Sequence, residues 1–96
     1  MLRIEAIIWL EGVVDKLLKK HNVRMSEVID VFKSNPHFRF AVERGYKAGE
    51  DVYAALGQTT SGCYIIVFFV YKKDGSVLIV SARDMTKTER NKYEKG

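Results

Sequence analysis

Apolar residues follow a helical period in the first third of this chain and a strand period in the rest. Between Glu11 and about Asn22 the less polar positions recur at spacings of one, four, five and eight residues. These positions are Val13, Val14, Leu17, Leu18 and His21. Such spacing predicts an amphipathic helix with one apolar stripe. Before it, the mixed segment Arg3 to Leu10 is typical of a short strand.

A second short helix is expected after the first. Ser26 suits its N-cap, and Glu27 places an acidic group in the first turn, where the helix dipole favours an anion. Val28, Ile29 and Phe32 give this helix an apolar edge. Asn35-Pro36 should end it, because the residue before a proline avoids the helical region.

Strand patterns fill the chain from Phe38 to Ser81. Apolar and polar residues alternate from Phe38 to Val42, and Cys63 to Tyr71 is continuously apolar, which favours a central strand covered on both faces. Asp74-Gly75 is a strong hairpin signal. Four strands are expected, at Phe38–Val42, Val52–Thr59, Cys63–Tyr71 and Val77–Ser81. Short connections favour an antiparallel meander, and the sequence therefore predicts an α+β fold.

The chain ends in a predicted helix that has little apolar surface. Thr86 and Glu89 stand three residues apart, as in a capping box, and Tyr93 is the main apolar residue that follows. A central strand that is apolar on both sides needs an apolar layer against each face of the sheet. So polar a helix can supply little of such a layer. We therefore expect a homodimer or a bound partner to complete the second face. The alternative is that Met85, Tyr93 and the connecting loop are enough.

Length and composition narrow the class of protein. The 96 residues are expected to form one domain, 1–96, and the 47% hydrophobic content excludes a disordered chain. A net charge of +4 is compatible with a polyanionic partner without establishing one. With a single cysteine, Cys63, no internal disulfide can form. No apolar run is long enough to span a membrane, so we expect a cytoplasmic protein without membrane contact.

The chain contains no signature of a metal site, a phosphate-binding glycine loop or a nucleophile elbow, so no cofactor is expected. Metal-free cleavage of RNA is the chemistry that these residue types serve most easily. That reaction needs a base for the 2′-hydroxyl proton, an acid for the leaving oxygen and cations for the phosphate. Histidine, glutamate, tyrosine, lysine and arginine side chains can fill these roles.

Candidate residues occur in three places along the chain. His21, next to Lys20 at the end of the first helix, titrates near neutral pH and suits acid or base work, although it can equally cap the helix. Glu50 can act as a base, and the alternative is an ordinary solvated loop. Arg83 suits bidentate phosphate binding, and its alternative is an ion pair with Asp84 or Glu89. The cations that follow it on the last helix include Lys87 and Arg90.

Several of these residues lie in motifs that resemble those of one known family. Lys20-His21-Asn22-Val23, the segment Gly49 to Gly57, and the closing run Val80 to Thr86 with Glu89, Arg90 and Tyr93 are similar to BrnT-type toxins. These are RelE-like ribonuclease toxins of type II toxin–antitoxin systems. The resemblance spans nearly the whole chain in the family's order, and the closing run is its most specific part.

The resemblance implies a RelE-like fold, RNA cleavage that halts translation and neutralisation by an antitoxin protein. It makes His21, Glu50, Arg83 and Tyr93 the candidate catalytic residues and Lys20, Lys87 and Arg90 the candidate RNA-binding residues. Two positions depart from the usual pattern: Leu10 stands where the family often has Asp, and Val52 where it often has Arg. These departures favour a second hypothesis, a weakened or inactive relative that binds an antitoxin or a nucleic acid.

Overall fold

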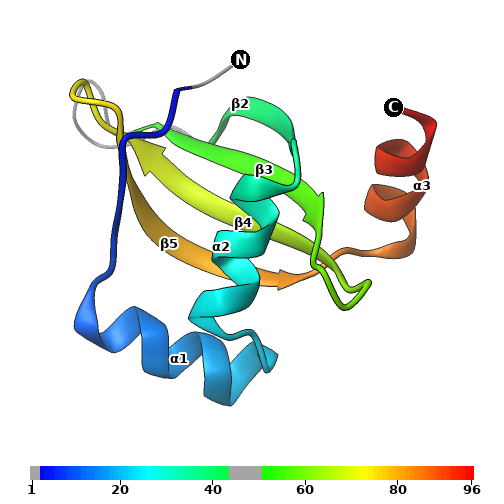
Figure 1. Ribbon diagram of the computed structural model, residues 1–96, viewed down its shortest axis with the longest axis horizontal. Coiled ribbons are helices and arrows are strands. Elements are labelled where there is room, and N and C mark those ends of the chain that lie inside the picture. The colour runs from blue at the N-terminus through cyan, green and yellow to red at the C-terminus, as the bar shows by residue number, and fades with distance from the viewer. Residues whose placement is uncertain (1–2, 44–50) are drawn as a thin grey trace.

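Helices α1 and α2 lie against one face of a five-stranded sheet, and helix α3 lies at the far end of the molecule (Figure 1). The computed structural model describes residues 3–43 and 51–96. Its elements are β1 (Ala6–Ile8), α1 (Glu11–His21), α2 (Met25–Lys33), β2 (His37–Glu43), β3 (Val52–Gln58), β4 (Tyr64–Tyr71), β5 (Ser76–Asp84) and α3 (Lys87–Lys95). The predicted α+β class and the order of elements are confirmed. No helix within the described ranges is long and apolar enough to cross a membrane.

The strands are ordered β1-β5-β4-β3-β2, so that β4 is central as its apolar sequence predicted. Strands β2 to β5 form the expected antiparallel meander, while β1 pairs in parallel with β5. One row of directly opposed residues crosses the meander. It consists of His37, Leu56, Ile66 and Arg83. Residues opposed in this way point to the same face of a sheet.

The face of the sheet that packs against α1 and α2 is called the inner face here. Alternation along β4 directs Ile65, Val67 and Phe69 to it. These side chains form one buried cluster with residues of both helices, including Leu17, Val28 and Val31. Phe69 is fully buried at its centre, and the rings of Phe32, Phe38 and Tyr53 surround it at centroid distances of 5.4, 6.1 and 5.9 Å.

The opposite side of the sheet, called the outer face here, has a smaller apolar cluster. Ala54, Leu56 and Ile66 form it, and Phe68, Met85 and Tyr93 pack against them. Leu56 and Ile66 are 1% and 2% exposed in the single chain. Met85 and Tyr93 therefore cover this part of the outer face within the single chain. This was the alternative to a partner chain. The homodimer stays a prediction.

The ends of the two N-terminal helices differ from the prediction in two details. Ser26 is not the N-cap of α2: the helix begins at Met25, and Arg24 is the capping residue. The reason is that the Glu27 carboxylate accepts the Arg24 backbone N–H at 3.0 Å, which fixes Glu27 as the third helical residue. Leu18 lies outside the apolar stripe of α1, since 47% of it is exposed.

The last strand is longer than its apolar pattern indicated. β5 runs from Ser76 to Asp84, so Arg83 lies within the strand and not beyond its end. The hairpin before β5 is confirmed, with Gly75 at φ 88°. The capping box of α3 is confirmed as well: the Glu89 backbone N–H donates to the Thr86 hydroxyl at 3.2 Å, and the Thr86 N–H donates to the Glu89 carboxylate at 2.8 Å.

Candidate active site

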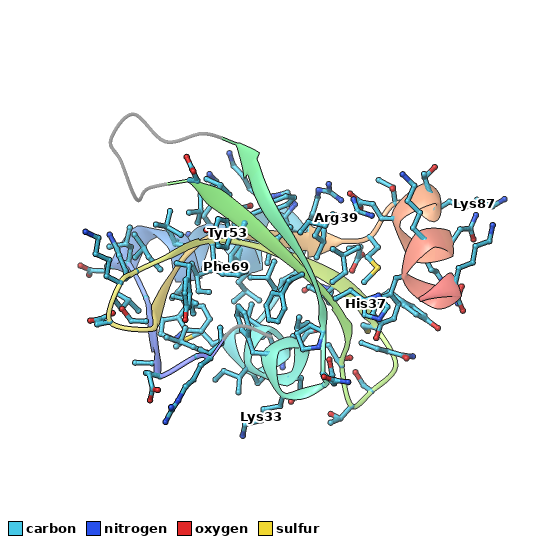
Figure 2. All side chains as sticks on the ribbon, turned by 90° about the horizontal axis from the view of Figure 1, so that it is seen from above. Lys33, His37, Arg39, Tyr53, Phe69 and Lys87 are labelled. Carbon is cyan, nitrogen blue, oxygen red and sulfur yellow. The ribbon has the colours of Figure 1, made fainter. Side chains whose placement is uncertain are left out.

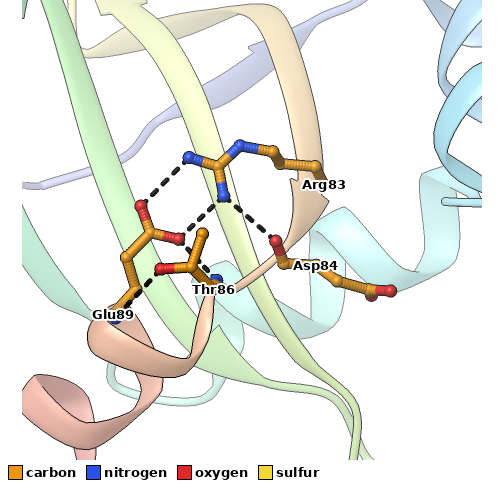
Figure 3. A network of polar contacts seen from close by, with 4 residues as sticks. All are labelled: Arg83, Asp84, Thr86 and Glu89. Carbon is orange, nitrogen blue, oxygen red and sulfur yellow. Dashed lines mark hydrogen bonds and ion pairs between the residues drawn. The ribbon is translucent and has the colours of Figure 1, made fainter.

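Arg83 projects from β5 and ties α3 to the sheet through its guanidinium group (Figure 3). Its Nη1 donates to Oε1 of Glu89 at 2.7 Å and to the Asp84 carbonyl at 3.1 Å, and its Nη2 donates to Oε2 of Glu89 at 3.0 Å. Both carboxylate oxygens are thus engaged in a bidentate pair. Of the alternatives considered for Arg83, the ion pair with Glu89 is the one that the structure contains.

This pair fixes the charge state of both partners. The pKa of Glu89 is lowered from 4.5 to about 2, mainly by the hydrogen bond from Arg83, with burial acting in the opposite direction and the backbone N–H of Thr86 adding to the lowering. The hydrogen bond to Glu89 raises the pKa of Arg83. Glu89 is therefore ionised at neutral pH and offsets the positive charge of Arg83. Three of the five guanidinium N–H groups are occupied, so two remain for another ligand.

A cluster of aromatic and titratable groups lies where α3 meets the outer face. The Tyr93 ring contacts the His37 ring at a centroid distance of 4.8 Å and the Tyr64 ring at 5.9 Å. The guanidinium group of Arg90 stacks on the Tyr64 ring, with its carbon atom 4.0 Å from the ring centroid. The Tyr64 hydroxyl donates to Glu94 at 3.3 Å. Two of the predicted site residues thus belong to this cluster: Tyr93 contacts the histidine, and Arg90 contacts Tyr64.

Two residues of β2 belong to this surface and were missed from the sequence. His37 is opposed to Leu56 and Arg39 to Ala54, which places both side chains on the outer face (Figure 2). The available signal was the alternation along the strand. Phe38 packs inward, so its two neighbours must point outward. Arg39 is half-buried and makes no hydrogen bond or ion pair with any described residue.

His21 and Lys20 lie at a different place, beside the C-terminal end of α1. His21 is half-buried in a polar hollow between the helix ends and the β3–β4 turn, while Lys20 is exposed. Arg24, Asp30 and Ser61 line the same hollow. A neighbouring hollow includes Tyr64 and Arg90, and the two share Cys63 and Asp84 as a common rim.

The structure therefore divides the predicted site residues into two groups. Arg83, Tyr93, Arg90 and Lys87 gather around α3, with Lys87 exposed on its first turn. Lys20 and His21 lie beyond the rim formed by Cys63 and Asp84. Glu50 falls outside the described residues. Within the ranges 3–43 and 51–96, no three His, Cys, Asp or Glu side chains come together in a way that could hold a metal ion.

Comparison with known proteins places the chain in a family. A family model described as the ribonuclease toxin BrnT of type II toxin–antitoxin systems matches residues 9–89. The chain belongs to this family. The BrnT match covers most of the sequence and includes both members of the Arg83–Glu89 pair, whereas Tyr93 lies just beyond it. Membership in a type II toxin family also implies a cognate antitoxin as a partner.

The fold of this BrnT-family chain is similar to that of a solved structure. It is the crystal structure of the Brucella abortus ribonuclease toxin BrnT, with a TM-score of 0.62 and 20% sequence identity. The similarity covers 85% of this chain and 97% of that chain. At this level of identity the match shows a common fold. A search of the curated proteins found no match.

Proposed function

We propose that this protein is an endoribonuclease toxin that cleaves RNA without a metal ion, stops translation and is neutralised by its antitoxin. The match of residues 9–89 to the BrnT family carries this proposal. The reaction would use the ribose 2′-hydroxyl as the nucleophile, so the protein has to supply only proton transfer and charge stabilisation.

The outer face near α3 offers groups of the kind that this reaction requires. His37 can take or give a proton, and its ring lies against that of Tyr93, whose hydroxyl is a second proton donor. Arg83 retains two free N–H groups for a phosphate oxygen. His21, beyond the Asp84 rim, and Glu50 remain candidates for the acid or base.

Cations and aromatic rings on α3 and β4 suit the binding of single-stranded RNA. Such strands are held by positive charge along the backbone and by stacking of bases on aromatic rings. Lys87 and Arg90 lie on exposed positions of α3, and the stack of Arg90 on Tyr64 forms a flat cationic surface beside them. Lys20 would extend the basic surface on the other side of the rim.

The ion pair between Arg83 and Glu89 favours a second function, that of a non-catalytic module that binds the antitoxin. Glu89 already neutralises this arginine, which weakens its pull on a phosphate. The outer face also has uncharged Val52 at the position where arginine is common in the family.

Cleavage in the presence of EDTA separates these two functions. The purified chain should cut a single-stranded RNA with EDTA present in large excess over trace metal. The products should end in cyclic 2′,3′-phosphate, and induced expression without antitoxin should arrest growth. Intact RNA together with full growth would leave only the antitoxin-binding module.

A further inference from the structure

The two described arginines on the outer strands of the meander differ in their electrostatic surroundings. Arg83 on β5 is held by both oxygens of Glu89 and by the Asp84 carbonyl. Arg39 on β2 makes no hydrogen bond or ion pair with any other described residue, although it is half-buried. A partly buried guanidinium group that is not paired with a carboxylate keeps its charge and its N–H donors available for an anionic ligand.

The position of Arg39 places it beside the groups proposed for chemistry. It stands two residues from His37 on the same face of β2, so their Cα atoms are roughly 6–7 Å apart. Its cross-strand neighbour Ala54 is small and fully buried, so no large side chain opposes Arg39 on β3. An arginine, a histidine and the Tyr93 ring thus line one side of the outer face, at the opposite edge of the meander from Arg83.

We propose that Arg39 is the arginine that binds an RNA phosphate on this face, while Arg83 acts as a positioning residue that holds α3 and Tyr93 in place. This inference rests on the proposed ribonuclease function and specifies which residue of the site contacts the substrate. An uncompensated guanidinium group can give both N–H donors of its planar edge to two phosphate oxygens. The guanidinium of Arg83 has most of its donors committed within the protein.

The test measures binding of a 2′-O-methyl RNA oligonucleotide, in which the nucleophile is blocked, by fluorescence anisotropy at several salt concentrations. Arg39→Gln should weaken binding about tenfold, and the slope of log K against log salt should fall by roughly 0.7, the value for one phosphate contact on a single strand. Arg39→Lys should recover part of the affinity, because it restores charge without the planar fork. Lys33→Gln removes the same charge from exposed α2 and should change binding less than about twofold.

The outcomes separate this inference from the proposed function. If the wild type cleaves ordinary RNA in EDTA and Arg39→Gln binds the blocked RNA as tightly as Lys33→Gln does, the inference fails and the ribonuclease function stands. If Arg39→Gln loses only affinity for an antitoxin, Arg39 serves a protein interface and the inference is again wrong. If the wild type neither binds nor cleaves RNA, both proposals fall. Should Arg39→Gln not fold, the same comparison is made with Arg39→Lys against Lys33→Arg.

Discussion

The two faces of the central sheet are closed in different ways. On the inner face, two helices cover a continuous apolar cluster in which Val28, Val31, Val67 and Phe69 are all fully buried. On the outer face, the buried apolar cluster is small, consisting of Ala54, Leu56 and Ile66, and a polar helix reaches it through Tyr93. The side chains of His37 and Arg83 lie in the same cross-strand row as Leu56 and Ile66, beside that small cluster.

This difference indicates that the two faces have different tasks. The inner face supplies most of the apolar burial that stabilises the fold. The outer face holds a histidine, two arginines and several aromatic rings within one surface, at the cost of weaker packing. Substitutions should therefore separate stability from activity according to the face on which they fall.

Phe69→Ala should have the largest effect, because Phe69 is fully buried and three aromatic rings surround it. A cavity of this size costs about 3–5 kcal/mol, a large part of the stability of a small domain. Urea unfolding measures the loss. Cleavage per folded molecule should be unchanged at a temperature where the variant is still folded. A stability loss below about 1 kcal/mol would contradict the assignment of the main core to the inner face.

Breaking the Arg83–Glu89 pair should have an intermediate effect. The two side chains are 34% and 16% exposed, so we expect a loss of about 1–2 kcal/mol, between the values for exposed and buried pairs. Arg83→Ala and Glu89→Ala should each show it, and a double-mutant cycle should give a coupling of similar size. If Arg83 acts mainly by positioning α3, both single variants lower RNA cleavage alike. A much larger activity loss in Arg83→Ala alone would instead show direct contact with the substrate.

Acid pH should weaken the same contact in a defined range. The pKa of Glu89 is lowered from 4.5 to about 2, so the pair contributes fully above pH 4.5 and its contribution is lost as the pH falls toward 2. Thermal unfolding between pH 5 and 2 should therefore be less steeply pH-dependent in Glu89→Gln than in the wild type. Asp15→Gln is a suitable control, since Asp15 forms only an exposed ion pair with Lys19. Identical slopes in the wild type and Glu89→Gln would contradict the assigned role of the pair.

His37→Asn should have the smallest effect on stability and a large one on catalysis. The side chain is exposed, so stability should change by less than about 0.5 kcal/mol. Loss of a proton-transfer group would lower kcat on the order of a hundredfold, with a smaller change in KM. His21→Asn is the matched variant beyond the Asp84 rim. If His21→Asn abolishes cleavage and His37→Asn does not, the acid or base lies at the end of α1.

Local chemistry made much of the fold predictable from the sequence. The Thr86–Glu89 capping box, the Gly75 hairpin and the uninterrupted apolar run of β4 each depend on residues near one another in the chain, and all three are confirmed. The predicted N-cap of α2 was wrong by two residues, because the helix is capped at Arg24, whose backbone N–H donates to the Glu27 carboxylate, and not at Ser26.

The arrangement of the site was harder to predict because it depends on pairing between distant strands. Alternation along β2 indicates that His37 and Arg39 face away from Phe38, but the sequence does not give the register that places them opposite Leu56 and Ala54. Whether Arg83 forms an ion pair within the protein depends on how α3 docks on the sheet. The sequence does not give this docking, so it left both phosphate binding and the ion pair with Glu89 as alternatives for Arg83. Likewise, His21 and Arg83 belong to motifs of one resemblance, yet His21 lines the hollow at the ends of α1 and α2, whereas Arg83 lies on the outer face opposite Ile66.

The central claim, that RNA binds on the outer face, is tested most directly by NMR of the labelled protein with the 2′-O-methyl oligonucleotide. The arginine Nε–Hε signals report on each guanidinium group separately. We predict that the signals of Arg39 and Arg90 shift with RNA concentration, while that of Arg3, which pairs with Glu5 near the N-terminus, does not. Shifts confined to Arg24 and the residues around His21 would contradict this claim and move the RNA site to the hollow at the ends of α1 and α2.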